Sequence, residues 1–79
     1  MQNSSDPETI IYVELLDEGT PTIRPTKGIF VADNIYRLLP TPNYDPEDET
    51  WMFHPGSLVR CEWEDNWYLG RILSATSLA

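Results

Sequence analysis

The two side chains of the 79-residue chain considered first as a catalytic base and a nucleophile are His54 and Cys61, and each is the only residue of its type. A Ser-His-Asp or Cys-His arrangement needs groups that the fold brings together, and the sequence shows no obvious nucleophile at a fixed spacing from His54. Cys61 falls on the apolar face of a predicted strand, where a buried thiol is unreactive. We therefore expect no catalytic residue and a protein that is not an enzyme.

A metal site is not expected either. One cysteine and one histidine cannot form a tetrahedral zinc site without carboxylates from elsewhere in the fold. Residues 45–49 are rich in carboxylate oxygens, but they lack the central glycine and the distant bidentate glutamate of a calcium loop. We interpret them as part of a solvated acidic loop (residues 43–49), and we expect neither a metal nor a cofactor.

The remaining binding chemistry lies in aromatic rings that stand near carboxylates. In the predicted register of the last hairpin, Trp67 and Leu69 lie on its mostly polar face, whereas Tyr44 and Trp51 border the acidic loop. Exposed rings of this kind can hold a cation or anchor a protein interface, although they can also simply complete a small core. For Trp67 both interpretations stay open. The candidate partner-binding residues are Trp67, Leu69, Trp51, Tyr44, Asp45, Glu47, Asp48 and Glu49.

Short β-strands must position these side chains. From Thr9 onward, β-forming runs alternate with turn residues, and no stretch sustains the i, i+3, i+4 spacing of a helix. Asp33-Asn34 predicts a two-residue turn, and two prolines make residues 22–24 an edge or a bend. The expected strands are residues 10–16, 29–32, 35–39, 50–53, 57–64 and 67–74. The sequence therefore predicts an all-β fold, a small SH3-like barrel or a curved antiparallel sheet of five to six strands, with one domain over residues 9–79 after a flexible tail at 1–8.

The last hairpin can be given a register. A two-residue turn at Asp65-Asn66 places Trp63 opposite Tyr68 on an apolar face, so we expect both rings to be buried. The same register sets Arg60 opposite Arg71, and two like charges in those positions repel. A carboxylate must then lie within salt-bridge reach of one of these arginines. The residues expected to supply that carboxylate are Asp45, Glu47, Asp48, Glu49 and Glu62.

The charge and the single cysteine limit the setting in which the protein works. Thirteen acidic against five basic residues give a net charge of -8, which repels phosphate backbones and argues against direct nucleic-acid binding. The charge either maintains solubility alone or faces a basic surface on another protein. No apolar run reaches the ~20 residues of a membrane span, and the N-terminus lacks the pattern of a signal peptide. With one cysteine, we expect a cytoplasmic protein without membrane contact.

Two resemblances add to this interpretation. Residues 12–20, 24–25, 36–38, 45–51 and 53–61 resemble a family of small uncharacterised bacterial proteins, which have an aromatic residue where this chain has Ile23; that family implies no activity. The C-terminal third, residues 55–61 followed by 67–72, is similar to the opening hairpin of Tudor and other SH3-like barrels. That similarity implies a barrel of five or six strands and, in Tudor domains, an aromatic cage for methylated lysine or arginine. Because the hairpin stands last here and first in Tudor domains, we take only the barrel from it.

The expected function is that of a small acidic protein-binding module, an adaptor or a regulator with an SH3-like fold. The alternative is an acidic inhibitor that occupies a basic, nucleic-acid-binding surface of its target. The sequence identifies no particular partner protein, and it is compatible with a monomer or a weak homodimer.

Overall fold

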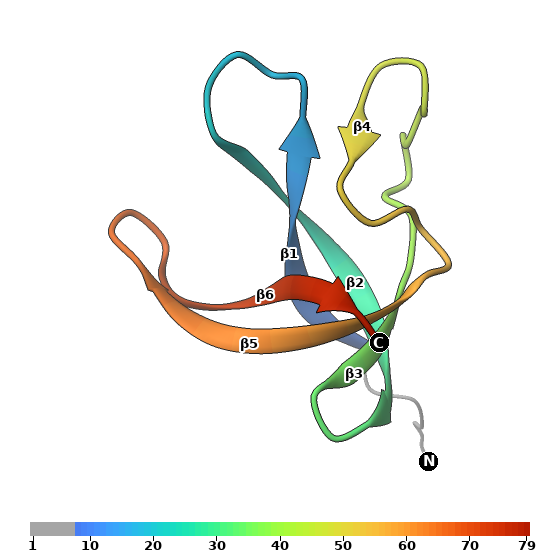
Figure 1. Cartoon of the computed structure of the whole chain (residues 1–79), viewed down its shortest axis with the longest axis vertical. Coiled ribbons are helices and arrows are strands. Elements are labelled where there is room, and N and C mark those ends of the chain that lie inside the picture. The colour runs from blue at the N-terminus through green and yellow to red at the C-terminus, as the bar shows by residue number, and fades with distance from the viewer. Residues whose placement is uncertain (1–7) are drawn as a thin grey trace.

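The computed structural model describes residues 8–79, which form six β-strands and no helix (Figure 1). The strands are β1 (Glu8–Leu16), β2 (Thr22–Ala32), β3 (Ile35–Leu38), β4 (Thr50–Trp51), β5 (Leu58–Asn66) and β6 (Gly70–Leu78). The prediction of an all-β fold with a small, curved, barrel-like sheet is confirmed. Of the predicted tail, Glu8 belongs to β1, and the rest lies outside the described residues.

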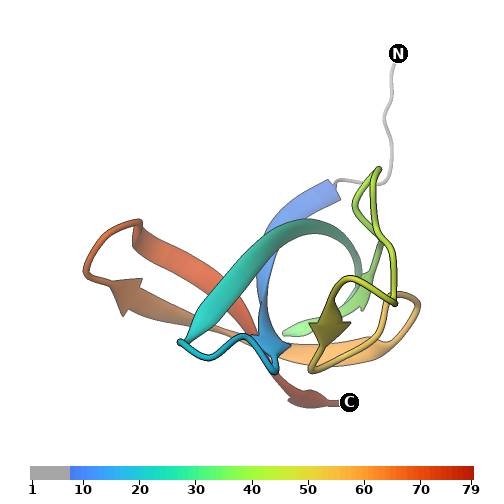
Figure 2. The same cartoon turned by 90° about the horizontal axis from the view of Figure 1, so that it is seen from above.

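Five of the strands form a ring, which Figure 2 shows from above. The sheet order is β2-β3-β5-β6-β1-β4, and β1 also pairs with β2, so the ring runs through β1, β2, β3, β5 and β6. Five strands that alternate in direction cannot all have antiparallel neighbours, so one pair must be parallel. That pair is β1–β6, and it meets at a single position, Tyr12 with Ser74. The ring is therefore fastened least tightly at this seam.

The core lies inside the ring and consists of side chains from the inward faces of the strands. Alternate residues of β1 point inward, as the period of two in a half-buried strand requires, and Ile11 and Val13 are completely buried. Gly28 on β2 leaves room for Ile11, because a Cβ at that position would collide with Ile11 Cδ1. The side chains that form the buried cluster are Ile11, Val13, Leu15, Leu38, Trp51, Val59, Cys61 and Leu73.

The first half of the chain follows the predicted turns. Asp33 and Asn34 form the two-residue turn between β2 and β3, and Asn34 takes a positive φ of 64°. Residues 22–26 of β2 pair with β1 alone, because hydrogen bonding on the other edge begins at Lys27, whose carbonyl oxygen accepts the backbone N–H of Leu39. Pro25, which has no N–H to donate, thus lies in a stretch with one free edge, as the sequence predicts.

The last hairpin departs from the predicted register. Trp63 lies opposite Leu73 rather than opposite Tyr68, a shift of five residues along β6. Because side chains alternate between the faces of a strand, a shift by an odd number exchanges the faces of β6 relative to β5. Arg60 lies opposite Ser77 and Arg71 opposite Asp65, so the expected arginine pair does not form.

Candidate partner-binding surface

The shifted register originates in the turn of the β5–β6 hairpin. Asn66 does not form a two-residue turn with Asp65, because its Oδ1 accepts the backbone N–H groups of Tyr68 and Leu69, each at 2.8 Å. A side-chain oxygen in this role stabilises a longer turn, here residues 67–69. Gly70 completes it at a φ of 87°, a conformation that costs glycine little. The turn is therefore specified by Asn66 and Gly70, four residues apart.

This turn exposes an aromatic cluster. Trp67 is 94% exposed and Tyr68 77% exposed, and their ring centroids lie 5.5 Å apart. Trp63 is 57% exposed, so the prediction that Trp63 and Tyr68 are buried is wrong. The reason is that β5 and β6 extend past the seam at Ser74, beyond the part of the hairpin that β1 pairs with (Figures 1 and 2). We refer to residues 63–71 as the hairpin tip.

A cation lies on the same face of the hairpin tip. Arg71 Nη1 donates to Asp65 Oδ1 at 3.1 Å, and Arg71 Cζ lies 6.0 Å from the centroid of the Trp63 ring. The predicted ion pair from the acidic loop or Glu62 to Arg60 or Arg71 is therefore wrong. Within residues 8–79, Asp65 is the carboxylate that pairs with Arg71, and none lies within 4.0 Å of Arg60.

Three of the predicted site residues serve the fold instead. Trp51 is 1% exposed and belongs to the core, and Tyr44 packs on it edge to face with ring centroids 5.0 Å apart. Trp51 Nε1 donates to Glu49 Oε1 at 2.7 Å, and Arg24 forms an ion pair with Glu49 Oε2. These two donors, Trp51 first, lower the pKa of Glu49 below its ordinary value. The acidic loop is anchored through this network.

The other loop carboxylates are exposed. Asp45 accepts the backbone N–H of Glu47 on its side chain, and its carbonyl oxygen accepts those of Asp48 and Glu49. The turn thus leaves the side chains of Asp45, Glu47 and Asp48 in solvent. The acidic loop lies away from the hairpin tip in both views (Figures 1 and 2). The predicted site is therefore divided: Trp67 and Leu69 lie at the hairpin tip, whereas the loop carboxylates lie elsewhere on the molecule.

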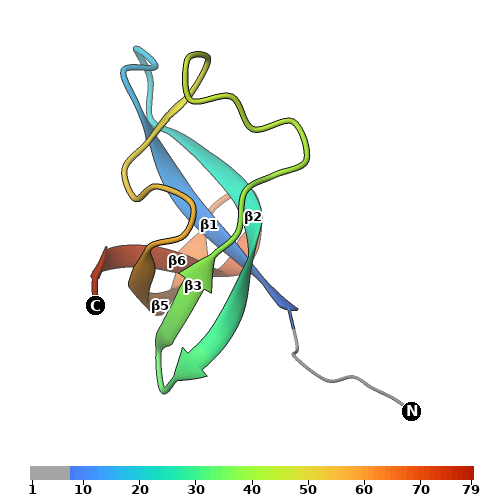
Figure 3. The ribbon, with the colours of Figure 1, turned by 90° about the vertical axis from the view of Figure 1, so that its right-hand side faces the viewer.

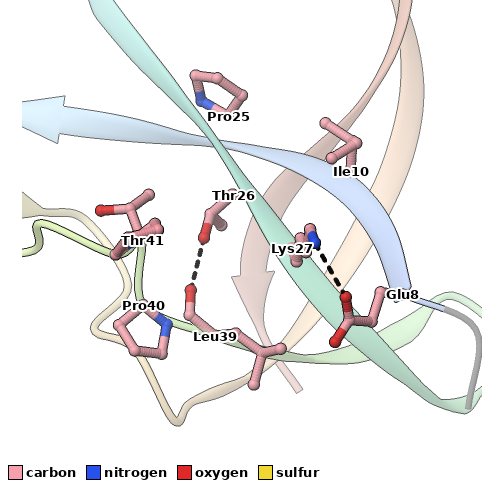
Figure 4. Close-up of a pocket in the computed structure, with 9 residues that line it drawn as sticks. Glu8, Ile10, Pro25, Thr26, Lys27, Leu39, Pro40 and Thr41 are labelled. Carbon is pink, nitrogen blue, oxygen red and sulfur yellow. Dashed lines mark hydrogen bonds and ion pairs between the residues drawn. The ribbon is translucent and has the colours of Figure 1, made fainter.

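A shallow apolar groove of about 470 Å³ lies beside β2 (Figure 4). Ile10, Pro25, Leu39 and Pro40 supply its apolar walls. Thr26 Oγ1 donates to the carbonyl oxygen of Leu39 at 2.6 Å and fixes the wall in place. At the rim, Lys27 Nζ and Glu8 Oε1 form an ion pair at 3.2 Å.

A second hollow of about 420 Å³ lies between β1 and the hairpin tip. Ile10 and Tyr12 line it from β1, and Trp63 and Leu69 line it from the hairpin. Ile10, which is half exposed, borders both hollows, so apolar surface continues from the first groove to the aromatic cluster. The sequence did not predict that Trp63 and Ile10 are exposed at this surface. Whether an apolar residue on a strand is exposed depends on which other strands cover it, and the local sequence does not specify that.

His54 and Cys61 lie in different surroundings in the fold. Cys61 is completely buried in the core, and burial raises the pKa of its thiol to about 11. At neutral pH it is therefore an uncharged thiol. His54 is exposed in the loop after β4. Within residues 8–79, no group of three or more His, Cys, Asp or Glu side chains is placed to hold a metal ion.

Comparison of the chain with protein-family models, with curated proteins and with solved structures finds no match. Across residues 8–79, no helix has the length and apolar character needed to cross a bilayer.

Proposed function

We propose that this chain is a small acidic protein-binding module, an adaptor or regulator with an SH3-like barrel, whose hairpin tip contacts a basic surface on a partner protein. It acts without catalysis of its own. Its one cysteine is an unpaired thiol in the core, which is compatible with the reducing environment of the cytoplasm.

The observation that carries the proposal is the exposure of Trp67 and Tyr68 on a turn that is itself well specified. Asn66 and Gly70 hold this turn, so the rings are kept in solvent by the local structure. Contiguous exposed apolar patches mark interaction sites, and tryptophan and tyrosine are enriched among the residues that dominate binding energy.

The charge around the tip indicates the kind of partner. Glu62, Glu64 and Asp65 are exposed on the same hairpin, and the whole chain carries a net charge of -8. Such a field accelerates association with a basic surface and repels phosphate backbones. A positively charged protein surface with an apolar centre therefore fits the tip best.

The test is affinity capture from an extract of the source cells with three forms of the chain as bait. The double variant Trp67→Ala/Tyr68→Ala should lose a partner that the wild-type chain retains. Phe30→Ala is the matched control, since Phe30 is an exposed ring on β2. Capture should also weaken with added salt. Recovery of the same proteins by the double variant as by the wild type would refute this function.

A second candidate function is that of an acidic inhibitor. The observation that favours it is a group of exposed carboxylates at the end of the ring that carries the acidic loop. The β1–β2 turn lies at that same end in Figures 1 and 3, and Leu16 pairs with Thr50 there. The exposed carboxylates on these two segments are Asp17, Glu18, Asp45, Glu47 and Asp48. An inhibitor that imitates nucleic acid would use these groups, so neutralising Asp45, Glu47 and Asp48 together should abolish capture while the hairpin double variant keeps it.

A further inference from the structure

The hairpin tip already holds one guanidinium group. Arg71 and Asp65 lie directly opposite each other on β6 and β5, and Trp63 is the next residue of β5 on the same face. Arg71 Nη1 lies 3.1 Å from Asp65 Oδ1, and its Cζ lies 6.0 Å from the centroid of the Trp63 ring. A carboxylate and an aromatic face thus converge on one planar cation.

This pair of groups suits arginine better than other cations. Guanidinium is planar, so it can lie over an aromatic ring while its N–H groups point at a carboxylate. An ammonium group can make the charge contact, but it lacks the flat face. The geometry at Trp63 and Asp65 therefore suits an arginine side chain.

The contact of Arg71 is open to exchange. The Arg71 and Asp65 side chains are 63% and 85% exposed, and solvent-exposed ion pairs are weak. Arg71 is also the only basic residue after Arg60, in a segment that carries three exposed carboxylates, Glu62, Glu64 and Asp65. An arginine from a partner can thus replace Arg71 with little loss to the fold.

Charge decides between the classes of occupant. A second copy of the chain brings another net charge of -8, and a nucleic acid brings phosphates, so both are repelled. A basic protein segment is attracted. The hollow beside Trp63, lined also by Ile10, Tyr12 and Leu69, offers apolar surface to the residues that flank the arginine.

We propose that the Trp63 ring and the Asp65 carboxylate form a guanidinium site, which the chain's own Arg71 fills in the free protein and an arginine of the partner fills in the complex. Arg71 is therefore an internal competitor that lowers the affinity for the partner. This inference rests on the proposed function, and it deepens it by naming the chemistry of the partner: an exposed segment with arginine next to apolar residues.

The experiment is a titration of the ¹⁵N-labelled chain with a short capped peptide in which one arginine lies between two leucines. The indole N–H signals of Trp63 and Trp67 report the binding. Trp51 is buried on β4, which pairs with β1 and not with the hairpin, so its signal serves as an internal reference. The peptides for comparison carry lysine or the uncharged citrulline in place of arginine. The arginine peptide should shift the signals of Trp63 and Trp67, with weaker binding of the lysine peptide and none of the citrulline peptide.

Two variants with equal charge separate competition from general electrostatics. Arg71→Gln should bind the arginine peptide roughly two- to five-fold more tightly, the range that loss of an exposed ion pair allows. Arg60→Gln changes the net charge by the same amount on the same hairpin, but Arg60 lies opposite Ser77, so it should gain less. Asp65→Asn and Trp63→Leu should each weaken binding, with the Trp51 signal unchanged as evidence that the fold is intact.

Equal gains for Arg71→Gln and Arg60→Gln would overturn the inference, because charge alone would then explain both. Equal affinity for the arginine and lysine peptides would overturn it as well. These failures differ from failure of the proposed function. If the Trp67→Ala/Tyr68→Ala bait loses its partner while Arg71→Gln binds no more tightly than Arg60→Gln, the module function stands and only the guanidinium site is refuted.

Discussion

Replacing Trp51 with phenylalanine is expected to destabilise the protein far more than the same replacement at Trp63. Trp51 is 1% exposed, packs on Tyr44, and donates from Nε1 to Glu49 Oε1 at 2.7 Å. Phenylalanine removes the donor and part of the ring while Glu49 keeps its charge. Trp63 is 57% exposed, so phenylalanine there removes much less buried surface and no hydrogen bond to a carboxylate.

The magnitude follows from the lost contacts. A hydrogen bond to a charged group contributes ~1.5–3 kcal/mol, and the smaller ring leaves a partly filled core, so Trp51→Phe should cost roughly 2–4 kcal/mol. A chain of 79 residues has a free energy of unfolding of roughly 4–12 kcal/mol. The variant should therefore fold wherever the stability of the wild type exceeds this cost, and its Tm should fall by roughly 8–32 °C. Trp63→Phe should stay within ~0.5 kcal/mol of the wild type.

The assay is urea denaturation followed by far-ultraviolet circular dichroism, which does not depend on the tryptophan that is removed. The two variants have identical chemical changes, so the difference between their midpoints measures burial and the Glu49 contact alone. If Trp51→Phe and Trp63→Phe have equal midpoints, the assignment of Trp51 to the core and of Trp63 to the surface is wrong.

Three more predictions follow from the core and the acidic loop. Gly28→Ala should destabilise the fold by ~1–3 kcal/mol, measured by the same denaturation, because the new Cβ collides with buried Ile11; an unchanged midpoint would contradict the close approach. The pKa of Glu49 is lower in the folded state than its ordinary value of 4.5, so the ionised carboxylate stabilises the fold fully above pH 4.5 and loses this effect as the pH falls through the lowered pKa. Glu49→Gln should therefore lose less stability in acid than the wild type. If the stabilities of the two proteins fall in parallel with pH, the network of Glu49 with Trp51 and Arg24 is contradicted. With its pKa raised to about 11, Cys61 should react with a thiol reagent at pH 8 only as fast as the protein opens; fast modification of the folded chain would show that the thiol is accessible.

The strand pattern could be predicted from the sequence because alternation and turn residues are local signals. The Asp33-Asn34 turn lies where its residues indicate, and Pro25 lies in the stretch of β2 with a free edge. The second Asp-Asn pair gives the opposite lesson. At Asp65-Asn66 the amide of Asn66 bonds forward to the backbone, and Gly70 takes the positive φ. The glycine four residues on was the signal for the longer turn.

The candidate site could be predicted only in part. The exposed position of Trp67 agrees with one of the two interpretations left open for it, whereas Trp51 belongs to the core. The exposure of Trp63 depends on how far the hairpin extends past β1, and that length follows from a single pairing, Tyr12 with Ser74. No local pattern encodes such a long-range contact. Alternation of apolar residues therefore cannot show whether the end of a strand is buried by another strand or exposed to solvent.

The seam between β1 and β6 also bears on the order of folding. The β1–β2, β2–β3 and β5–β6 pairs each join neighbours in the chain, so their loops are short and close early. Tyr12 and Ser74 are separated by nearly the whole chain, and bringing them together carries the largest loss of chain entropy in the sheet. We therefore expect closure of the ring to be the slow, late event. On this expectation the β5–β6 hairpin, tip included, forms before the two ends of the chain meet.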